Sequence, residues 1–528
     1  MNPSSAHRAL KPVDAVIVGA GQVGSLFAAR LAAAGKRVKI FEAGPKRKLG
    51  QLASSQIWSR QLKGTPGYQV SGGAHALGVN FNTGQGSGGS ALHHYACWFR
   101  LHPEDFEMHR RHGVASDWPF GYEALQSAYD AVQTEVGLSG DARAESWRPA
   151  GAPYPMPPLP VFKQGELIAK GFAAKGLHVA PLPMAINSVP YKGRPACIYD
   201  GWCDAGCPTG ALANPLVTYL RDAQRQGARI EHDAHVIRIA TNANGTRATG
   251  VEVALASGEV VFQEAGVVIV AGYAVETPRL LLASANPAHP RGLGNSGDQL
   301  GRRLHTHVAC TVFGRFAEAT ENHLGVSGGQ LVCQDRYTKD QGLGFVGGYQ
   351  WLIAHALRPN DLLGIAAGRA DLFGDALTRF MNDDASHVGS MTLVGESIPL
   401  AENRVELGDR MDRFGMPLAK LTHRFDDNAV KLHAHASREG QEIFRAAGAT
   451  QTWQGPMVGM HLLGGASMGK DPAQSVTDAF GAIHDIPNLF IGGPSLFPSS
   501  GAVNPTFTAS ALAHRAAAHL IERWADRV

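Results

Sequence analysis

The chain has 528 residues, of which 44% are hydrophobic and 18% are charged, and its formal net charge is +3. This length is too great for one small core, so we expect two or more structural units. The near-balanced charge does not support binding to nucleic acid or to an acidic membrane surface. The sequence has no run of about 18 apolar residues, so it predicts no transmembrane helix.

The N-terminal stretch has the order of a dinucleotide-binding unit. A short apolar strand, residues 15–18, runs into the turn Gly19-Ala20-Gly21-Gln22-Val23-Gly24, which has the G-x-G-x-x-G spacing. A helix follows and stops at Gly35, and a second strand, residues 37–41, ends on Glu42. Strand, turn, helix, strand and terminal acid in this order indicate a nucleotide site, with FAD and NAD both open at this point.

Each glycine of the turn has a separate physical role. Gly19 makes the tight turn, Gly21 lets the backbone approach a pyrophosphate, and Gly24 lets the helix pack closely on the strand. The helix N-terminus then offers N–H groups and the positive end of its dipole to the phosphates. The carboxylate of Glu42 can accept hydrogen bonds from the ribose hydroxyls.

The next segments are less regular. Residues 50–85 look like loop and turn, and they lead into a second glycine-rich run that contains Gly88, Gly89 and Ser90. Such a run suits backbone lying against a flat cofactor ring, although a plain surface loop has the same composition. Residues 148–160 are rich in proline and predict an extended connection.

The remaining elements alternate between strands and helices. We expect strands at 236–239, 251–255, 267–270, 308–313 and 345–353, and helices at 125–136, 214–226, 276–284, 426–447 and 508–524. The strand 267–270 ends in Ala271-Gly272 before a helix, so this second strand–glycine–helix crossing could return to the nucleotide site.

Three of the six cysteines, Cys197, Cys203 and Cys207, fall within eleven residues. That grouping is not the scattered pattern of a disulfide scaffold in a protein of this size. The three cysteines could form a zinc site that lacks its fourth ligand, or they could be thiols packed in the interior; the sequence leaves both interpretations open. The other three cysteines stand alone and are more typical of buried thiols.

Two residues near the C-terminus could act on an alcohol. His461 lies in the segment Gly459–Gly465, and a histidine can be the base for a hydroxyl because its ordinary pKa lies near neutral pH. Asn504 can donate a hydrogen bond to a substrate oxygen without titrating. His305 and His307 would share one face of a strand and could bind a metal, but no further ligands cluster near them in the sequence.

These motifs together resemble the glucose–methanol–choline (GMC) family of FAD oxidoreductases. The N-terminal unit, the Gly88-Gly89-Ser90 run, the segment ETPRLLLAS at 276–284, His461 and Asn504 occur in the family's order. The resemblance implies an α/β protein with a Rossmann-like FAD-binding domain and an α+β substrate-binding domain built on an antiparallel sheet. It also decides FAD over NAD, and it makes His461 the base and Asn504 its partner.

The resemblance further implies a domain division and a set of cofactor contacts. The FAD-binding domain would comprise 12–125, 200–305 and 456–528, with the cysteine loop 197–207 at its edge; the substrate-binding domain and proline-rich connection would comprise 126–196 and 306–455. The implied cofactor contacts are Gly19, Gly21, Gly24, Glu42, Gly88, Gly89, Ser90, His93, Ala271, Gly493, Asn504 and Pro505. His93 matches a family histidine that can bond covalently to the flavin 8α-methyl group, although His94 stands where a tryptophan is expected.

A narrower resemblance is to the catalytic subunits of membrane-associated FAD sugar and polyol dehydrogenases, those for glucose, gluconate, sorbitol and fructose. It rests on residues 154–160, 187–197 and 206–211 and on the cysteine spacing. In those enzymes the three cysteines hold a [3Fe–4S] cluster, so Cys197, Cys203 and Cys207 become its expected ligands. The chain departs from them at Ile198 and at Met460, and the second change leaves the sugar open.

The function this implies is an FAD-dependent dehydrogenase that oxidises a hydroxyl of a sugar, glycoside or polyol and passes electrons through the cluster to a cytochrome or quinone-linked acceptor. The alternatives are an oxidase of the same family that uses oxygen, and a non-catalytic electron-transfer flavoprotein subunit. Residues 1–13 lack the apolar region of a secretory signal. We therefore expect a small signal-bearing partner subunit and a periplasmic or membrane-associated location through it, and otherwise a cytoplasmic one.

Overall fold

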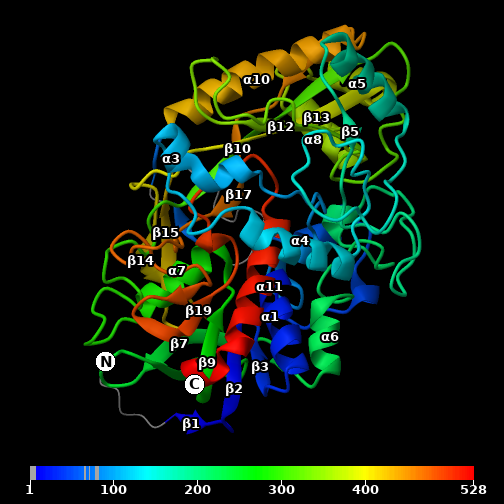
Figure 1. Cartoon of the computed structure of the whole chain (residues 1–528). Coiled ribbons are helices and arrows are strands. Elements are labelled where there is room, and N and C mark those ends of the chain that lie inside the picture. Colours follow the sequence, from blue (N-terminus) through cyan, green and yellow to red (C-terminus); the bar gives the residue numbers. More distant parts are fainter. Residues whose placement is uncertain (1–6, 65–66, 71, 76, 78–82) are drawn as a thin grey trace.

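The computed structural model describes residues 7–64, 67–70, 72–75, 77 and 83–528. The predicted loop at 50–85 therefore lies partly outside the described residues. Two main sheets divide the molecule, with the nucleotide-type sheet in the lower half of Figure 1 and the second sheet in the upper half beneath α10.

The first sheet has a parallel centre with the strand order β19-β9-β2-β3-β6. Its strands are β2 (Val13–Val18), β3 (Val38–Phe41), β6 (Arg229–Glu231), β9 (Val260–Val270) and β19 (Ile486–Ile491), with the short β18 (Ala482–Ile483) antiparallel at one edge. Ala15, Val16 and Ile17 are fully buried, as expected for a strand covered on both faces. The helices α1 (Gln22–Ala33), α6 (Tyr219–Arg225) and α11 (Thr506–Glu522) pack side by side.

The strand β9 is long enough to pair with antiparallel strands along its first half and with parallel strands along its second half. Its first half pairs antiparallel with β8 (Ala248–Ala254), which pairs with β7 (His235–Thr241), and β1 (Arg8–Ala9) adds to β9 in parallel. Its second half, residues 265–270, joins the parallel centre beside β2. The carboxyl ends of β2, β9 and β19 thus meet at one edge, where ligands of such sheets bind.

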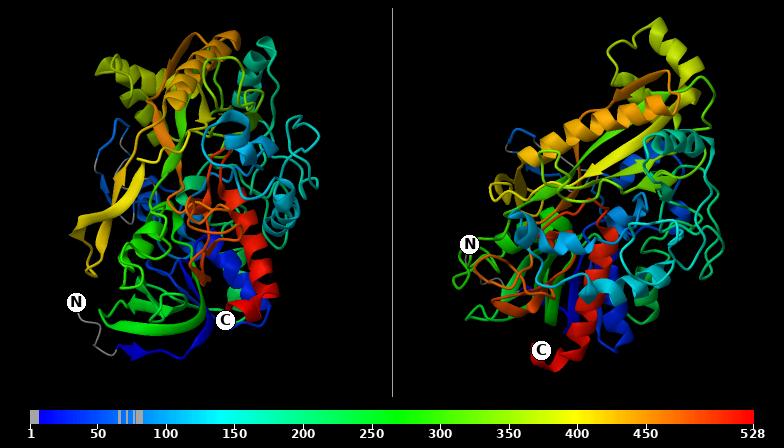
Figure 2. Two further views of the ribbon diagram at one scale, coloured as in Figure 1. Left: turned by 60° about the vertical axis from the view of Figure 1, so that its left-hand side comes forward. Right: turned by 45° about the horizontal axis from the view of Figure 1, so that its top comes forward.

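The second sheet is antiparallel and carries its own core. Its strands are β5 (Ala180–Pro181), β10 (His305–Arg315), β11 (Leu331–Cys333), β12 (Tyr349–Ile353), β13 (Val388–Gly395), β16 (Gln451–Gln454) and β17 (Val458–Leu463). The helices α10 (Asp427–Ala446) and α5 (Lys163–Ala174) cover one face, and Figure 2 shows α10 lying along the sheet. The Asp426 side chain caps α10 by accepting from the N–H groups of Asn428 and Ala429.

The smaller elements connect these layers. The third sheet consists of β4 (Gln69–Val70), β14 (Arg404–Met411) and β15 (Pro417–Thr422). The other helices are α2 (Gln56–Leu62), α3 (Met108–His112), α4 (Glu123–Val136), α7 (Tyr273–Ala283), α8 (Pro359–Ala367), α9 (Asp375–Arg379) and α12 (Trp524–Arg527). In the part of the chain that the structure describes, none of the helices has the length and apolar character needed to cross a membrane.

The predicted fold class is confirmed, with local corrections. The predicted loop at 50–85 contains the helix α2, whose start is capped by the Ser55 hydroxyl. The helix expected from residue 214 begins only at Tyr219, because Asn214 and Pro215 form turns that precede it. The domain boundaries remain a prediction; the strand β17, predicted to belong to the nucleotide unit, pairs with β10 of the second sheet.

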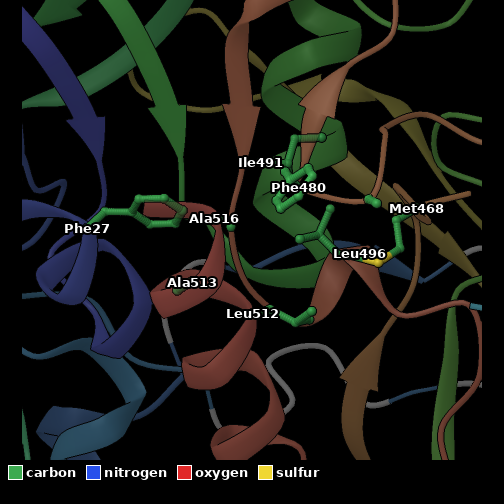
Figure 3. Close-up of a pocket in the computed structure, with 10 residues that line it drawn as sticks. Phe27, Met468, Phe480, Ile491, Leu496, Leu512, Ala513 and Ala516 are labelled. Atoms are coloured by element: carbon green, nitrogen blue, oxygen red, sulfur yellow. The ribbon is translucent and has the colours of Figure 1, made fainter. Parts of the chain in front are cut away.

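The core between α1 and α11 contains one small void, of about 10 Å³. Figure 3 shows its apolar lining, with Phe27 from α1, Leu512, Ala513 and Ala516 from α11, and Ile491 from β19. A space of this size holds about one water molecule at most, and its walls offer little to bind one. We therefore treat it as a packing defect and not as a substrate site.

Candidate active site

The glycine turn after β2 is built as the sequence predicts. Gly19 has φ 101°, and a Cβ there would lie 2.8 Å from the carbonyl oxygen of Ala271. Gly21 is different, because a Cβ there would meet no described atom within 4 Å. The first turn of α1 contains no acidic residue, and Gly21 at its N-cap supplies no side-chain acceptor. Free N–H groups and open space beside Gly21 fit an anionic pyrophosphate.

The Glu42 carboxylate is buried at the same edge and is already engaged. Its Oε2 accepts from the N–H of Ala20 at 2.8 Å, and its Oε1 accepts from those of Gly44 at 2.9 Å and Gly86 at 2.8 Å. Burial raises its pKa, and these N–H groups act in the opposite direction. Glu42 therefore ties both glycine-rich segments together, a role that sequence reasoning missed when it assigned the carboxylate to the ribose alone.

The second glycine-rich run lies against the first turn. Gly88 donates its N–H to the carbonyl of Ala20 at 3.0 Å, and a Cβ on Gly89 would lie 3.2 Å from the Cα of Gly21. The Ser90 hydroxyl accepts from the N–H of Gly84 at 3.1 Å, which closes the loop. The structure thus brings the predicted residues of this run to the nucleotide turn.

His93 and His94 follow this loop and differ in their contacts. The Nε2 atom of His94 lies 2.8 Å from the carbonyl oxygen of Ala213. The Nε2 atom of His93 is buried and has no hydrogen-bond partner among the described residues. Burial lowers the pKa of His93 to about 3, so the ring is neutral.

The start of α11 lies next to the start of α1. The Gln22 amide in the first turn of α1 donates to the Ser510 hydroxyl of α11 at 3.4 Å. Pro505 is the N-cap of α11, and Asn504 precedes it. Gly493 follows β19 with φ 109°, and a Cβ there would meet no described atom within 4 Å. Asn504, Pro505 and Gly493 therefore converge on the same edge as the glycine turn.

His461 sits on β17 in an unusual backbone conformation, with φ 65°. Its Nε2 lies 3.2 Å from Nδ2 of Asn504, and its Nδ1 lies 3.1 Å from Nδ1 of His307. Burial lowers the pKa of His461 to about 4, so the ring is neutral at pH 7 and can take up a proton. The predicted pair His461 and Asn504 is thus brought together from positions 43 residues apart.

Sequence reasoning missed two neighbours of this pair. His307 was considered only with His305 as a metal pair, but a bulge between Thr306 and His307 turns the two histidines to different partners, Arg303 for His305 and His461 for His307. Gln350 of β12 donates to Oδ1 of Asn504 at 3.3 Å. The His-x-His spacing could have drawn attention to His307, whereas Gln350 has no sequence signal.

The cysteine loop folds beside α2 but does not form a site for a single metal ion. In the described ranges, no three His, Cys, Asp or Glu side chains are grouped so that they could hold a metal ion. Cys203 is buried, and Cys197 and Cys207 are partly exposed. Burial is the main cause that raises the pKa of Cys203 to about 12, and the nearby Cys197 and Cys207 thiols contribute to it. Cys197 and Cys207 are therefore close enough to Cys203 to affect its charge.

Comparison with known proteins identifies the family. The model of the N-terminal part of the GMC oxidoreductases matches residues 13–309, which is more than half of the chain. The model of their C-terminal part matches residues 399–513. The chain belongs to the GMC oxidoreductase family. The family's cofactor is FAD, and the open glycine turn at α1 has the free N–H groups and the space that fit its pyrophosphate.

Curated relatives match over nearly the full length. The 2-methyl-1,2-propanediol dehydrogenase of Mycolicibacterium austroafricanum is 30% identical, and the match covers 98% of this chain and 96% of the relative. The fructose dehydrogenase large subunit of Gluconobacter japonicus is 28% identical over 96% and 97% of the two chains. Among solved structures, pyridoxine 4-oxidase from Mesorbium loti matches with a TM-score of 0.68 and 18% identity, over 96% of this chain and 98% of that one. That structural likeness supports the fold.

Proposed function

We propose that this GMC oxidoreductase is an FAD-dependent dehydrogenase that oxidises a CH–OH group of a sugar, glycoside or polyol. The observation that carries the proposal is the pairing of His461 Nε2 with the Asn504 amide at 3.2 Å beside the start of α11. The relatives named for fructose and for a short diol support a hydroxyl donor.

The chain's own residues define where FAD is held. The N–H groups at the start of α1 and the space beside Gly21 would hold the pyrophosphate, Glu42 would lie beside the ribose, and Gly493 and Pro505 would border the ring. FAD held there would supply a hydride acceptor for the substrate carbon.

His461 and Asn504 have different roles at the substrate hydroxyl. Nε2 of His461 accepts the hydroxyl proton as the carbon is oxidised, and Nδ2 of Asn504 donates to the same oxygen and holds it in place. A non-catalytic electron-transfer subunit would need neither side chain. Their pairing therefore favours the enzyme over that alternative.

The direct test of this function is an anaerobic screen. Sugars, polyols and short diols are offered to the purified holoenzyme with an artificial electron acceptor, and flavin bleaching is followed in parallel. We expect at least one polyhydroxylated substrate to bleach the flavin and to reduce the acceptor. The proposal is wrong if simple monohydric alcohols alone are oxidised and every polyhydroxylated compound fails.

We further propose that Cys197, Cys203 and Cys207 hold a [3Fe–4S] cluster that would carry single electrons to the external acceptor. The support is their spacing and Pro208 directly after the last one. A cluster separates its thiolates more widely than a single ion does. An oxidase would not need this group, so it also discriminates between dehydrogenase and oxidase.

Iron content decides this proposal. Anaerobically purified protein is expected to contain about three irons per flavin. Cys203→Ser should lose the iron and slow transfer to the physiological acceptor, while substrate still reduces the flavin at close to the wild-type rate. Cys310→Ser serves as the matched control, because that thiol lies on β10 and is hydrogen-bonded at 3.3 Å to Ser437. Iron-free protein with full FAD and normal acceptor-linked activity would rule the cluster out.

We propose that His93 attaches the flavin covalently. Its ring is neutral, and its buried Nε2 has no hydrogen-bond partner among the described residues. Such a nitrogen would suit a bond that replaces one C–H bond of the 8α-methyl group, with the proton lost and the two electrons left on the flavin ring until the external acceptor removes them. Flavin should then stay with acid-precipitated wild-type protein and be released from His93→Ala. Release from both proteins would show that the attachment is non-covalent.

We also propose a small partner subunit that carries the export signal and brings the chain to the periplasmic or membrane side. The support is the relative that is named as the large subunit of a fructose dehydrogenase. Expressed alone, the chain is expected to stay in the cytoplasm. Its recovery from the periplasm without any partner would contradict the proposal.

A further inference from the structure

His461 lies in the middle of a line of buried hydrogen bonds. The acceptor at one end of this line determines which group donates in each of these bonds. That end is the carbonyl oxygen of Ser500, which lies 3.3 Å from Nε2 of His307. A carbonyl only accepts, so this nitrogen of His307 carries the proton. Burial lowers the pKa of His307 to about 3, and the neutral ring therefore has an unprotonated Nδ1.

This arrangement fixes the tautomer of His461. The two Nδ1 atoms of His307 and His461 lie 3.1 Å apart, and since that of His307 accepts, that of His461 must donate. A neutral histidine has one N–H. Nε2 of His461 is then left unprotonated, which is the state that a base for a hydroxyl requires, and its lone pair accepts the Asn504 amide at 3.2 Å.

The amides on the other side have the same direction. Asn504 donates from Nδ2 to Nε2 of His461, which turns its Oδ1 towards Gln350, and Gln350 donates to this oxygen at 3.3 Å. Gln334 donates to Oε1 of Gln350 at 2.8 Å. His102 donates from Nε2 to Oε1 of Gln334 at 3.1 Å. Every donor from His102 to His307 thus points towards the Ser500 carbonyl.

The far end of this line is held by charge and stacking. The ring of His102 stacks on Tyr337 with centroids 3.8 Å apart, and the Tyr337 hydroxyl donates to Asp105 at 2.7 Å. The backbone N–H of His102 donates to the same carboxylate at 2.7 Å. Asp105 in turn forms an ion pair with Lys339 at 2.5 Å.

The middle of the line is shielded from water. Gln350 is 0% exposed, Gln334 is 4% exposed and Asn504 is 8% exposed. A buried amide that reversed would place two acceptors or two donors face to face, and such unsatisfied groups are costly away from water. The amides therefore cannot turn one by one.

We propose that His307 and Gln350 are positioning residues that keep Nε2 of His461 unprotonated, through the one-directional line of hydrogen bonds from His102 to the Ser500 carbonyl. His307 acts from the Nδ1 side, and Gln350 acts through the orientation of the Asn504 amide. If the line ran the other way, Asn504 would present its oxygen to His461, and Nε2 would have to carry the proton. This inference rests on the role of His461 as the base in the proposed function.

The test is nitrogen NMR of the holoenzyme labelled with ¹⁵N in histidine, with His461 assigned by the signals lost in His461→Gln. At pH 7 the wild type is expected to show one tautomer, with Nδ1 protonated and Nε2 bare. His307→Phe keeps a ring of similar shape and removes the acceptor. We expect this variant to show a second tautomer with Nε2 protonated and to reduce its flavin about 2- to 10-fold more slowly, the effect of one lost hydrogen bond.

Gln350→Leu provides the second variant, because it breaks the line on the other side of the base without adding a charge. It should slow flavin reduction by a similar factor of about 2- to 10-fold. Thr311→Val is the matched control on β10, since the Thr311 hydroxyl pairs with Thr392 at 3.0 Å. Flavin content and circular dichroism identify any variant that fails to fold.

The outcomes separate this inference from the proposed function. A wild-type tautomer protonated at Nε2 overturns the inference, and so does an unchanged single tautomer in His307→Phe. Neither result depends on turnover. If His461→Ala instead reduced its flavin at the wild-type rate, the base assignment would fail even though the measured tautomer would stand.

Discussion

His461 adopts a left-handed backbone conformation that side chains other than glycine rarely take, and such a conformation costs of the order of 1–3 kcal/mol. The bulge between Thr306 and His307 on the paired strand accompanies it. Together they turn the imidazole towards Asn504 and His307 in place of a regular position in the strand. The strain is thus located at the residue to which we assign proton transfer.

The lowered pKa of His461 predicts the pH dependence of flavin reduction. Because burial lowers this pKa from an ordinary 6.5 to about 4, the neutral base is present throughout the range above pH 5. The rate should be flat from about pH 7 to pH 5 and should fall as pH drops through 4. Stopped-flow rates at constant ionic strength measure this. A midpoint near 6.5 would mean that the base titrates as an exposed histidine.

The same shift has a consequence for stability. The unfolded ring takes up a proton near its ordinary pKa of 6.5, and the folded ring takes one up only near 4. Between these values the unfolded state binds more protons, so the free energy of unfolding falls as pH is lowered from 6.5 towards 4. Urea unfolding at pH 7 and pH 5 is expected to show this loss.

Sequence reasoning predicted the tight turn at Gly19, Gly21 and Gly24, because it depends on the local spacing of six residues. The roles of these glycines towards FAD remain a prediction. The network around His461 depends on contacts between distant strands, and for that reason Gln350 and Gln334 could not be predicted. The contact of Glu42 with Gly86 could be predicted only by knowing that a loop 44 residues away returns to the turn.

We assign the pyrophosphate of FAD to the turn between β2 and α1, and this assignment is tested by a substitution at Gly21. Its φ of −73° suits alanine, and no described atom obstructs a Cβ there. Gly21→Ala should therefore fold normally but purify largely free of FAD, because the methyl group occupies the pyrophosphate's approach. The visible absorbance of bound flavin, relative to the protein concentration, measures the loss.

Gly364→Ala in α8 is the control for this variant, since a Cβ there also meets no described atom within 4 Å. It should retain full flavin. Normal flavin content in Gly21→Ala would show that the open side of Gly21 does not face the nucleotide.

At the element level, the sequence predicted the bounds of helices with strong hydrophobic periodicity well. It predicted segments without a clear periodicity poorly. The helices α10 and α11 lie within about one or two residues of their predicted ranges. The segments between 310 and 455 form long-range antiparallel pairs, such as β10 with β13, and a single sequence carries no record of such pairings. The helix α2 lay hidden in a glycine- and serine-rich stretch because one serine cap starts it.

Across the whole molecule, a buried charge cluster joins segments that lie far apart in the chain. Lys339 is fully buried and pairs with Asp105 at 2.5 Å and with Glu396 at 2.9 Å. Burial alone would lower the pKa of Lys339, but the two carboxylates outweigh it and raise that pKa. The cluster connects the loop after Leu101 to the end of β13 and supports the stacked pair of His102 and Tyr337.

Removing the cation should be costly for folding. Lys339→Met leaves two carboxylates buried without a partner, and breaking such a group typically costs about 3–5 kcal/mol of unfolding free energy. Lys175→Met is the control, because its pair with Glu442 is largely exposed and is worth under about 1 kcal/mol. Urea unfolding of both variants gives the comparison. Equal small losses would mean that the cluster is not a buried structural unit.

The central claim is that His461 is the base that accepts the proton from the substrate hydroxyl, and one measurement tests it most directly. Flavin bleaching is followed by anaerobic stopped flow in wild type, His461→Ala and Asn504→Ala, at a saturating concentration of the substrate found in the screen. General-base assistance is worth about 10²- to 10⁴-fold, so His461→Ala should bleach its flavin slower by that factor while it still binds FAD. Asn504→Ala should lose less, because the amide only holds the hydroxyl in place. Bleaching of His461→Ala at the wild-type rate would contradict the account.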